Sequence, residues 1–82
     1  MIPSRDILVR TVEEALVKMR VAHVSQIYDY VAKKHNLSEY DKGLCDSNGD
    51  PVYKHEVRWC LQTLKQRGVV QRGKSLGYWE LA

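Results

Sequence analysis

The sequence predicts a small α+β domain in which three helices pack with a short three-stranded antiparallel sheet. Two amphipathic segments in the first half of the chain have the spacing of helices. A third, longer helix is bounded by Asp50-Pro51 at its start and by Gly68 at its end. Two short apolar runs then flank a basic, glycine-containing loop, which is typical of a hairpin at the end of the chain.

The length of 82 residues allows one domain, and we assign residues 1–82 to it. A hydrophobic fraction of 44% and a charged fraction of 28% are ordinary for a globular domain and argue against disorder. No apolar run approaches the ~20 residues that span a bilayer, and the N-terminal segment lacks the pattern of a secretory signal. The two cysteines form no disulfide framework. We therefore expect a cytoplasmic protein without a membrane partner.

The first predicted helix covers residues 4–19. Ser4 is a suitable N-cap, and Asp6 suits the positive end of the helix dipole. Apolar residues recur at helical spacing on one side of this segment, and charged residues occupy the other side. The apolar side contains Leu8, Val12, Ala15, Leu16 and Met19.

A short Val-rich segment, VAHVS at residues 21–25, follows and predicts an extended strand. Ser25 is then the predicted N-cap of a second helix over residues 26–36, which Asn36 terminates. The apolar stripe of this second helix contains Ile27, Tyr28 and Val31.

The segment at residues 37–50 has mixed character. Ser38 favours one helical turn, and Asn48-Gly49 indicates a chain reversal. The DSNGD stretch has the composition of a calcium loop, but Pro51 stands at the sixth position, where that loop needs glycine. Val57 stands at the twelfth position in place of glutamate. We therefore interpret the stretch as a turn before a capped helix, and we expect no metal or other cofactor.

The third predicted helix covers residues 51–67 and has strong signals at both ends. Asp50 is the predicted N-cap, Pro51 fits the first helical position, and Gly68 fits the left-handed position beyond the last turn. The predicted core side contains Tyr53, Val57, Cys60, Leu61 and Leu64. The predicted exposed side contains His55, Arg58, Trp59, Gln62 and Gln66.

Residues 69–71 and 78–81 are predicted strands, and the loop at residues 72–77 between them is called the wing below. A hairpin is not stable alone in water, so we expect it to pack on the third helix with the VAH segment as a third strand. This order of elements is that of a winged helix-turn-helix domain with a C-terminal wing. Because large aromatic side chains are usually covered, we expect Trp59 to stack on the wing or on the long loop before its helix.

The stretch GDPVYKHEVRWCLQTLKQRGVVQRGKSLGYWEL resembles the N-terminal domain of Mrr-type restriction endonucleases. The matching features are the acidic, glycine-bearing loop, VRW on the third helix, LQTLKQRGVV running into a strand, and RG in the wing. The resemblance implies a DNA-binding winged helix that, in the restriction family, delivers a nuclease to modified DNA. This chain ends at Ala82, which leaves no room for a nuclease domain. We therefore expect no enzyme, but a reader of DNA sequence or modification in a restriction-system-like or transcription-regulating role.

Basic charge is concentrated in the last third of the chain. Residues 1–50 hold seven Lys/Arg and eight Asp/Glu, whereas residues 51–82 hold six and two. Such asymmetry favours an anionic partner, here double-stranded DNA. In the major groove, the predicted contacts of the third helix are Lys54, His55, Arg58 and Gln62. On the backbone or minor groove, the predicted contacts of the wing are Arg72 and Lys74.

The alternative hypothesis is a winged helix that binds a protein partner or a second copy of itself and does not bind DNA. The modest net charge of +3, the five tyrosines and Trp59 suit that role. Zinc binding is not predicted, because no Cys or His pair has the short spacing of zinc sites. No catalytic residue is predicted either, because no nucleophile and base have motif spacing.

Overall fold

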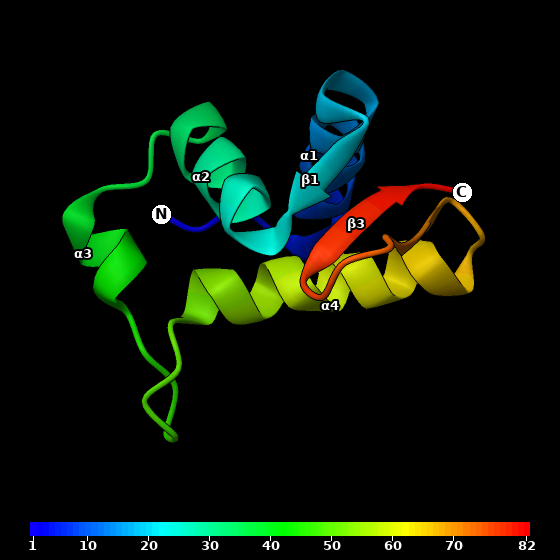
Figure 1. Cartoon of the computed structure of the whole chain (residues 1–82). Coiled ribbons are helices and arrows are strands. Elements are labelled where there is room, and N and C mark those ends of the chain that lie inside the picture. Colours follow the sequence, from blue (N-terminus) through cyan, green and yellow to red (C-terminus); the bar gives the residue numbers. More distant parts are fainter.

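The computed structural model describes all 82 residues and contains four helices and a three-stranded antiparallel sheet, so the predicted α+β class is confirmed. Figure 1 shows α1, α2 and the sheet on one side of α4, which runs beneath them as a long base. This arrangement is compatible with a winged helix. In chain order the elements are α1 (Arg5–Met19), β1 (Val21–His23), α2 (Val24–Lys34), α3 (Glu39–Gly43), α4 (Val52–Gln66), β2 (Val70–Arg72) and β3 (Tyr78–Leu81).

Strand β3 lies between β1 and β2 and is antiparallel to both. One cross-strand row places Ala22, Trp79 and Arg72 beside one another. Side chains that are directly opposite in neighbouring strands lie on the same face of the sheet. Ala22 and Trp79 are buried, so this face packs on the helices. Arg72 lies on the same face, in the edge strand β2.

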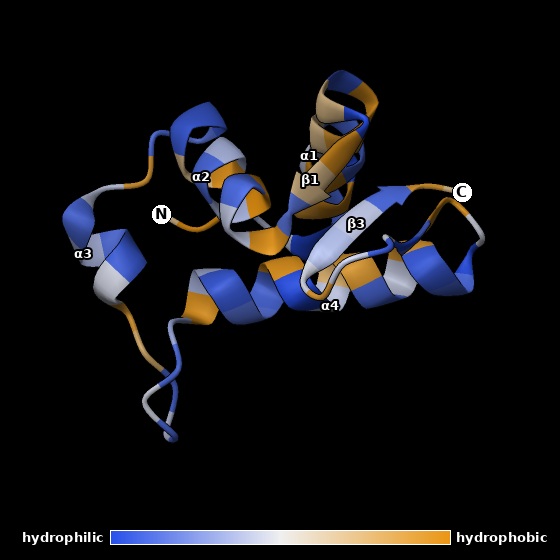
Figure 2. Ribbon diagram, in the orientation of Figure 1, coloured by the Kyte–Doolittle hydropathy of each residue, from blue (hydrophilic) through white to orange (hydrophobic).

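The core is one cluster of twelve buried residues that joins α1, α2, α4 and the sheet. Figure 2 shows the hydrophobic segments of α1 and α2 and the orange bands of α4 around the space that these elements share. All five residues predicted on the core side of the third helix are buried. No helix combines the length and the apolar character needed to cross a membrane. The cluster contains Leu8, Val12, Leu16, Ala22, Ile27, Val31, Val57, Cys60, Leu61, Leu64, Val70 and Trp79.

Helix α2 begins two residues before its predicted start, because its N-cap is His23 and not Ser25. The His23 Nδ1 accepts a hydrogen bond from the Ser25 N–H at 3.1 Å. The Gln26 Oε1 in turn accepts a hydrogen bond from the His23 N–H at 2.9 Å. An imidazole nitrogen therefore supplies the acceptor that we expected from a hydroxyl. Beyond the last turn, Asn36 adopts a φ of 51°, which confirms the predicted stop.

A fourth helix, α3, occupies the segment where the sequence favoured a single turn, so the prediction of three helices was one short helix too few. The Ser38 Oγ accepts a hydrogen bond from the Asp41 N–H at 3.1 Å. The Asp41 carboxylate accepts hydrogen bonds from the Met1 ammonium at 2.9 Å and from the Ser38 N–H at 3.2 Å. These bonds, that of the Met1 ammonium first, lower the pKa of the Asp41 carboxyl.

The N-cap of α4 is Pro51, and the predicted cap Asp50 lies one residue outside the helix. The reason is an extended pairing before the helix. The Val52 N–H donates to the Leu44 carbonyl at 2.8 Å, and Pro51 forms a β-bridge with Cys45. The chain therefore stays extended through Pro51 and turns helical only at Val52.

The C-terminal end of α4 confirms the predicted role of Gly68, which has a φ of +76°. The Val69 N–H donates to the Leu64 carbonyl at 2.9 Å, and the Gly68 N–H donates to the Lys65 carbonyl at 3.0 Å. These two bonds form a Schellman motif. Strand β2 follows over Val70–Arg72, one residue later at both ends than predicted, so Arg72, predicted as the first residue of the wing, belongs to the strand.

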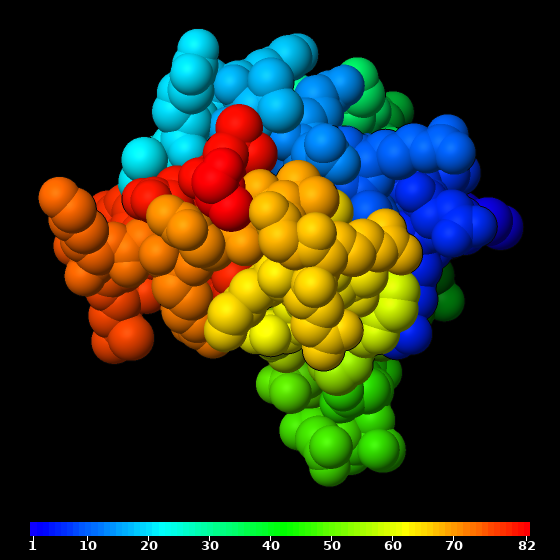
Figure 3. Space-filling model, turned by 90° about the vertical axis from the view of Figure 1, so that its right-hand side faces the viewer, coloured from blue at the N-terminus to red at the C-terminus, as the bar shows by residue number.

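Residues 44–51 form a second projection, which we call the acidic hairpin because Asp46 and Asp50 are its only charged residues. Figures 1 and 3 both show it extending from the start of α4 on the side away from the other helices. The Asp46 N–H donates to the Asp50 carbonyl at 2.9 Å. The Asp46 Oδ1 accepts hydrogen bonds from the N–H groups of Asn48 and Asp50 at 2.8 and 3.1 Å. The acidic hairpin is therefore held by its own hydrogen bonds.

Candidate nucleic-acid interface

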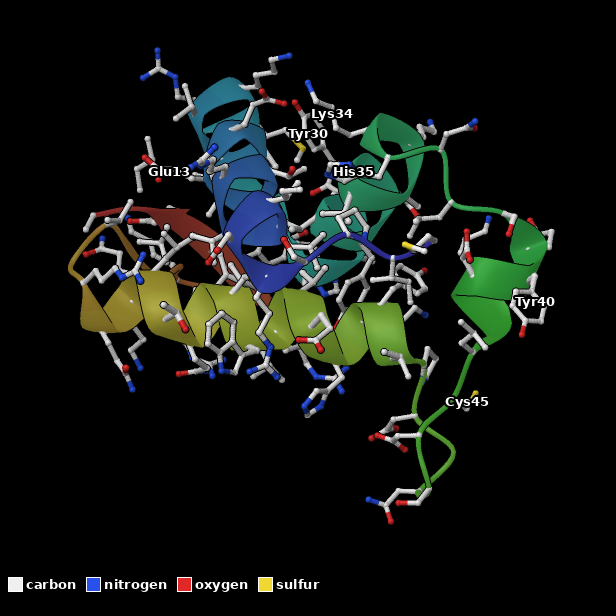
Figure 4. The ribbon with its side chains drawn as sticks, turned by 180° about the vertical axis from the view of Figure 1, so that it is seen from behind. Glu13, Tyr30, Lys34, His35, Tyr40 and Cys45 are labelled. Carbon is white, nitrogen blue, oxygen red and sulfur yellow. The ribbon has the colours of Figure 1, made fainter.

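The side of α4 that is opposite the core carries three of the predicted contact residues. His55, Arg58 and Gln62 are all exposed. Their spacing of three and four residues places them in a row along the helix. Figure 4 shows side chains projecting from this side of α4. The 15 residues of α4 form an element about 22 Å long that carries this row.

Arg58 is exposed but already has two partners within the chain. Its Nη1 donates to the Tyr28 hydroxyl at 3.2 Å, and its Nη2 lies 3.9 Å from the Asp50 Oδ2. The Lys54 Nζ lies 5.4 Å from the centre of the same Tyr28 ring. Tyr28 of α2 therefore organises both basic residues in the N-terminal half of α4. Sequence reasoning placed Tyr28 in an apolar stripe and missed this role, since periodicity does not reveal what a hydroxyl contacts.

The two basic residues of the wing differ in their surroundings. The Arg72 guanidinium lies 4.7 Å from the centre of the Trp79 ring, a cation–π contact over a buried side chain. Lys74 is exposed and has no hydrogen bond or ion pair within the chain. Arg72 is therefore held against the sheet, whereas Lys74 is free to move toward an anion.

The two glycines of the wing are required by contacts inside the protein. Gly77 has a φ of +84°, and a Cβ at this position would lie 2.6 Å from the His23 Nε2. A Cβ at Gly73 would lie 3.0 Å from the Tyr78 Cβ. Gly77 therefore lets the chain turn while it passes closely over the His23 ring.

A family model of the Mrr N-terminal domain matches residues 8–82, nearly the whole chain. The chain belongs to the Mrr N-terminal domain family. The resemblance seen in the sequence is therefore confirmed. No curated protein and no solved structure matches the chain.

In this Mrr N-terminal domain, Glu56 and Glu80 are the two acidic residues after residue 50. Each of them bonds a residue outside the exposed row of α4. Glu56 accepts a hydrogen bond from the Arg5 Nε at 2.7 Å, and Glu80 accepts one from the Gln71 Nε2 at 2.7 Å. Neither carboxylate forms an ion pair with a basic residue of the last third of the chain. Among the basic residues of that region, only Arg58 forms an ion pair within the chain, with Asp50.

The row on α4 extends further than the residues we predicted. Lys65 and Gln66 are exposed in the last turn of the helix, whereas the exposed C-cap Arg67 lies beside Arg10 and Trp59 on the side of α1. Gln66 was predicted on the exposed side, but Lys65 was missed. Its distance of seven residues from Arg58 was a signal in the sequence, because positions i and i+7 share one face of a helix.

Trp59 is covered by α1, and the prediction that the wing or the preceding loop covers it was wrong. The Arg5 guanidinium lies 4.2 Å from the centre of the Trp59 ring. The same arginine is held by Glu56, one helical turn from Trp59 along α4. The ring also packs partly buried against the core. Trp59 therefore joins α4 to α1. The ring is covered, as we expected of a large aromatic side chain, but by a different element.

The two cysteines have different surroundings. Cys60 is fully buried in the core cluster, and this burial raises its pKa to about 11. A thiol with so high a pKa is a poor nucleophile and a poor metal ligand near neutral pH. Cys45 is exposed on the acidic hairpin.

Proposed function

We propose that this Mrr N-terminal domain binds double-stranded DNA, with α4 in the major groove and the wing on the backbone. The observation that carries the proposal is the exposed row of His55, Arg58 and Gln62. In Figures 1 and 3, β2, the wing and β3 lie alongside α4. A major groove about 12 Å wide accepts one α-helix. Membership of the family supports a DNA-binding role, because that role is what the resemblance implies. The proposed role is binding and includes no catalytic step.

The residues of α4 have different proposed tasks. Arg58 can pair with the O6 and N7 of guanine, and Gln62 can pair with the N6 and N7 of adenine. The Tyr28 hydroxyl holds Arg58 in a fixed position, which lowers the entropy lost when a base edge is bound. Lys54 lies beside the Tyr28 ring and His55 is exposed, so both suit contacts at the rim of the groove.

Arg72 and Lys74 have the proposed task of positioning the duplex. Contacts to phosphates fix orientation without reading sequence. Arg72 is preorganised over Trp79, and Lys74 supplies a mobile charge at the tip of the wing. Lys65 extends the proposed phosphate contacts along α4.

The test is a binding titration with fluorescently labelled duplexes of random sequence, with and without methylated bases. We expect binding that weakens as salt is added, and selection from the random pool then yields a preferred duplex. Arg58→Ala should cost roughly 1–3 kcal/mol on the preferred duplex and little on the random pool. Arg10→Ala is the matched control, because it removes an exposed arginine from α1. Equal losses for both variants on the preferred duplex would contradict base reading by Arg58.

A second candidate function is binding of a protein partner or a second copy of this chain. It is favoured by exposed apolar side chains at and near the outer face of the sheet. Val21, Leu76 and Tyr78 are 52%, 95% and 38% exposed. The same titration separates the two functions, because a protein-binding module has no salt-dependent duplex affinity to lose. An increase of molecular mass with concentration would support self-association.

A further inference from the structure

The acidic hairpin is well ordered by hydrogen bonds but contributes nothing to the core. Every residue from 43 to 50 is exposed, and none belongs to the buried cluster. Its tip is closed by the Asp46 carboxylate and by a Gly49 N–H that donates to the Asp46 carbonyl at 3.0 Å. Burial of apolar surface therefore does not explain this projection, which leaves its position and its charge as possible reasons for it.

The position of the acidic hairpin relates it directly to the proposed DNA-contact row. In Figures 1 and 3 it extends past α4 on the side away from α1 and α2. Its last acidic residue contacts the row, since the Asp50 Oδ2 lies 3.9 Å from the Arg58 Nη2. No lysine or arginine occurs between residues 43 and 53, so both carboxylates act on their surroundings without a basic residue beside them in the chain. A duplex along α4 would meet this negative charge at the N-terminal end of the helix.

We propose that the acidic hairpin is an electrostatic selectivity element, which weakens non-specific phosphate binding at the start of α4 by repulsion and by occupying Arg58. Charges within about 8–10 Å act on each other at physiological salt, so the negative Asp50 carboxylate repels a phosphate that approaches Arg58. A base edge offers Arg58 two aligned acceptors and no net charge, and it is repelled less. The inference rests on the proposed DNA binding and assigns to Asp46 and Asp50 the task of raising the specificity ratio.

The structure allows the charge to be removed without breaking the hairpin. Both hydrogen bonds to the Asp46 side chain end on Oδ1, an acceptor that asparagine retains. The variant Asp46→Asn/Asp50→Asn therefore removes two negative charges and keeps the acceptor that closes the tip. The matched control is Glu13→Gln/Glu39→Gln, which makes the same change of net charge on α1 and α3. Glu13 and Glu39 lie on neither projection and not on α4.

The measurement is the affinity of each variant for a labelled random-sequence duplex over a range of salt concentrations. We expect Asp46→Asn/Asp50→Asn to bind about fivefold more tightly than the parent, and the control to change by less than about twofold. The salt slope of the neutralised variant should steepen by about one, because Arg58 becomes available to a phosphate. Adding Arg58→Ala to the neutralised variant should abolish this extra slope.

The outcomes separate this inference from the proposed function. If the parent binds duplexes and the neutralised variant matches the control, the selectivity role is overturned and DNA binding stands. If only the neutralised variant binds, the inference is supported in its strongest form. If neither protein binds any duplex at the lowest salt, DNA binding and the selectivity role both fail. Unfolding midpoints equal to that of the parent would show that the hairpin variants are folded.

Discussion

The wing and the acidic hairpin are two projections beside α4, and they are built in opposite ways. Each reverses the chain with a glycine at a φ of +84°, Gly77 in the wing and Gly49 in the acidic hairpin. The wing connects β2 and β3, and Trp79 of β3 is buried in the core. By contrast, every residue of the acidic hairpin up to Asp50 is exposed. The wing carries positive charge and the acidic hairpin carries negative charge.

The wing is therefore part of the fold, whereas the acidic hairpin is attached to it. Changes at the base of the wing should therefore unfold the protein, and changes in the acidic hairpin should leave stability intact. Conversely, charge changes on both projections should alter binding with opposite sign.

The largest expected effect is on Trp79, which anchors the strands of the wing. Trp79→Ala should lower the free energy of unfolding by roughly 3–5 kcal/mol, because it removes a large buried side chain and leaves a cavity. Asn48→Ala, at the tip of the acidic hairpin, should change it by less than about 0.5 kcal/mol. Urea unfolding followed by circular dichroism measures both. A similar loss at the two sites would mean that the acidic hairpin is as much a part of the fold as the wing.

The two glycines offer a closely matched pair, since they share a φ of +84° and differ in their neighbours. Gly49→Ala should cost about 1 kcal/mol, because an L side chain is strained in this region and nothing else lies within 4 Å. Gly77→Ala should cost about 2–3 kcal/mol, because its Cβ also displaces the His23 ring and disturbs the cap of α2. Urea midpoints of the two variants measure the difference. Equal midpoints would show that the wing does not press on His23.

A smaller difference is expected within the wing itself. Arg72→Ala should cost about 0.5–1 kcal/mol of stability, because it removes the cation–π contact over Trp79. Lys74→Ala should have no measurable effect, since Lys74 is exposed and unpaired. Thermal unfolding of the two single variants is sufficient. Identical curves would contradict the view that Arg72 is held by the sheet.

The smallest expected effect is a local response of α3, which leads into the acidic hairpin, to acid. The Asp41 pKa is lowered in the folded protein, so its contribution is complete above the unfolded value of 3.8. That contribution is lost as the pH falls below 3.8 through the lowered folded value. NMR amide shifts of Ser38 and Asp41 should then move while those of β3 stay constant. The α3 account would be wrong if both regions moved together, or if the α3 amides did not move.

Local signals explain which parts of this fold could be predicted from the sequence. The Gly68 and Val69 N–H groups end α4 by donating to carbonyls three and five residues earlier, so the role of Gly68 depends on its neighbours in the chain. The exposed positions of α4 follow from helical period for the same reason. The order of helices and strands was therefore predicted correctly, except for α3 and for shifts of one or two residues at element ends.

Contacts between distant segments explain what the sequence could not reveal. Arg5 covers Trp59, and the Met1 ammonium binds Asp41, across 54 and 40 residues of chain. Tyr28 reaches Arg58 across 30 residues. The candidate site was thus predicted as a set of positions on α4 and the wing, but the partners that hold its basic side chains depend on tertiary packing. Whether those positions contact DNA stays a prediction.

The salt dependence of duplex binding tests the central claim most directly, namely that α4 and the wing bind DNA through their basic residues. For the parent, the logarithm of the association constant should fall linearly with the logarithm of salt concentration between about 50 and 200 mM. For Arg72→Ala/Lys74→Ala, the slope should be shallower by about two, one for each lost phosphate contact. A wing variant with the parent's affinity and slope, or a parent that binds no duplex at low salt, would contradict the account.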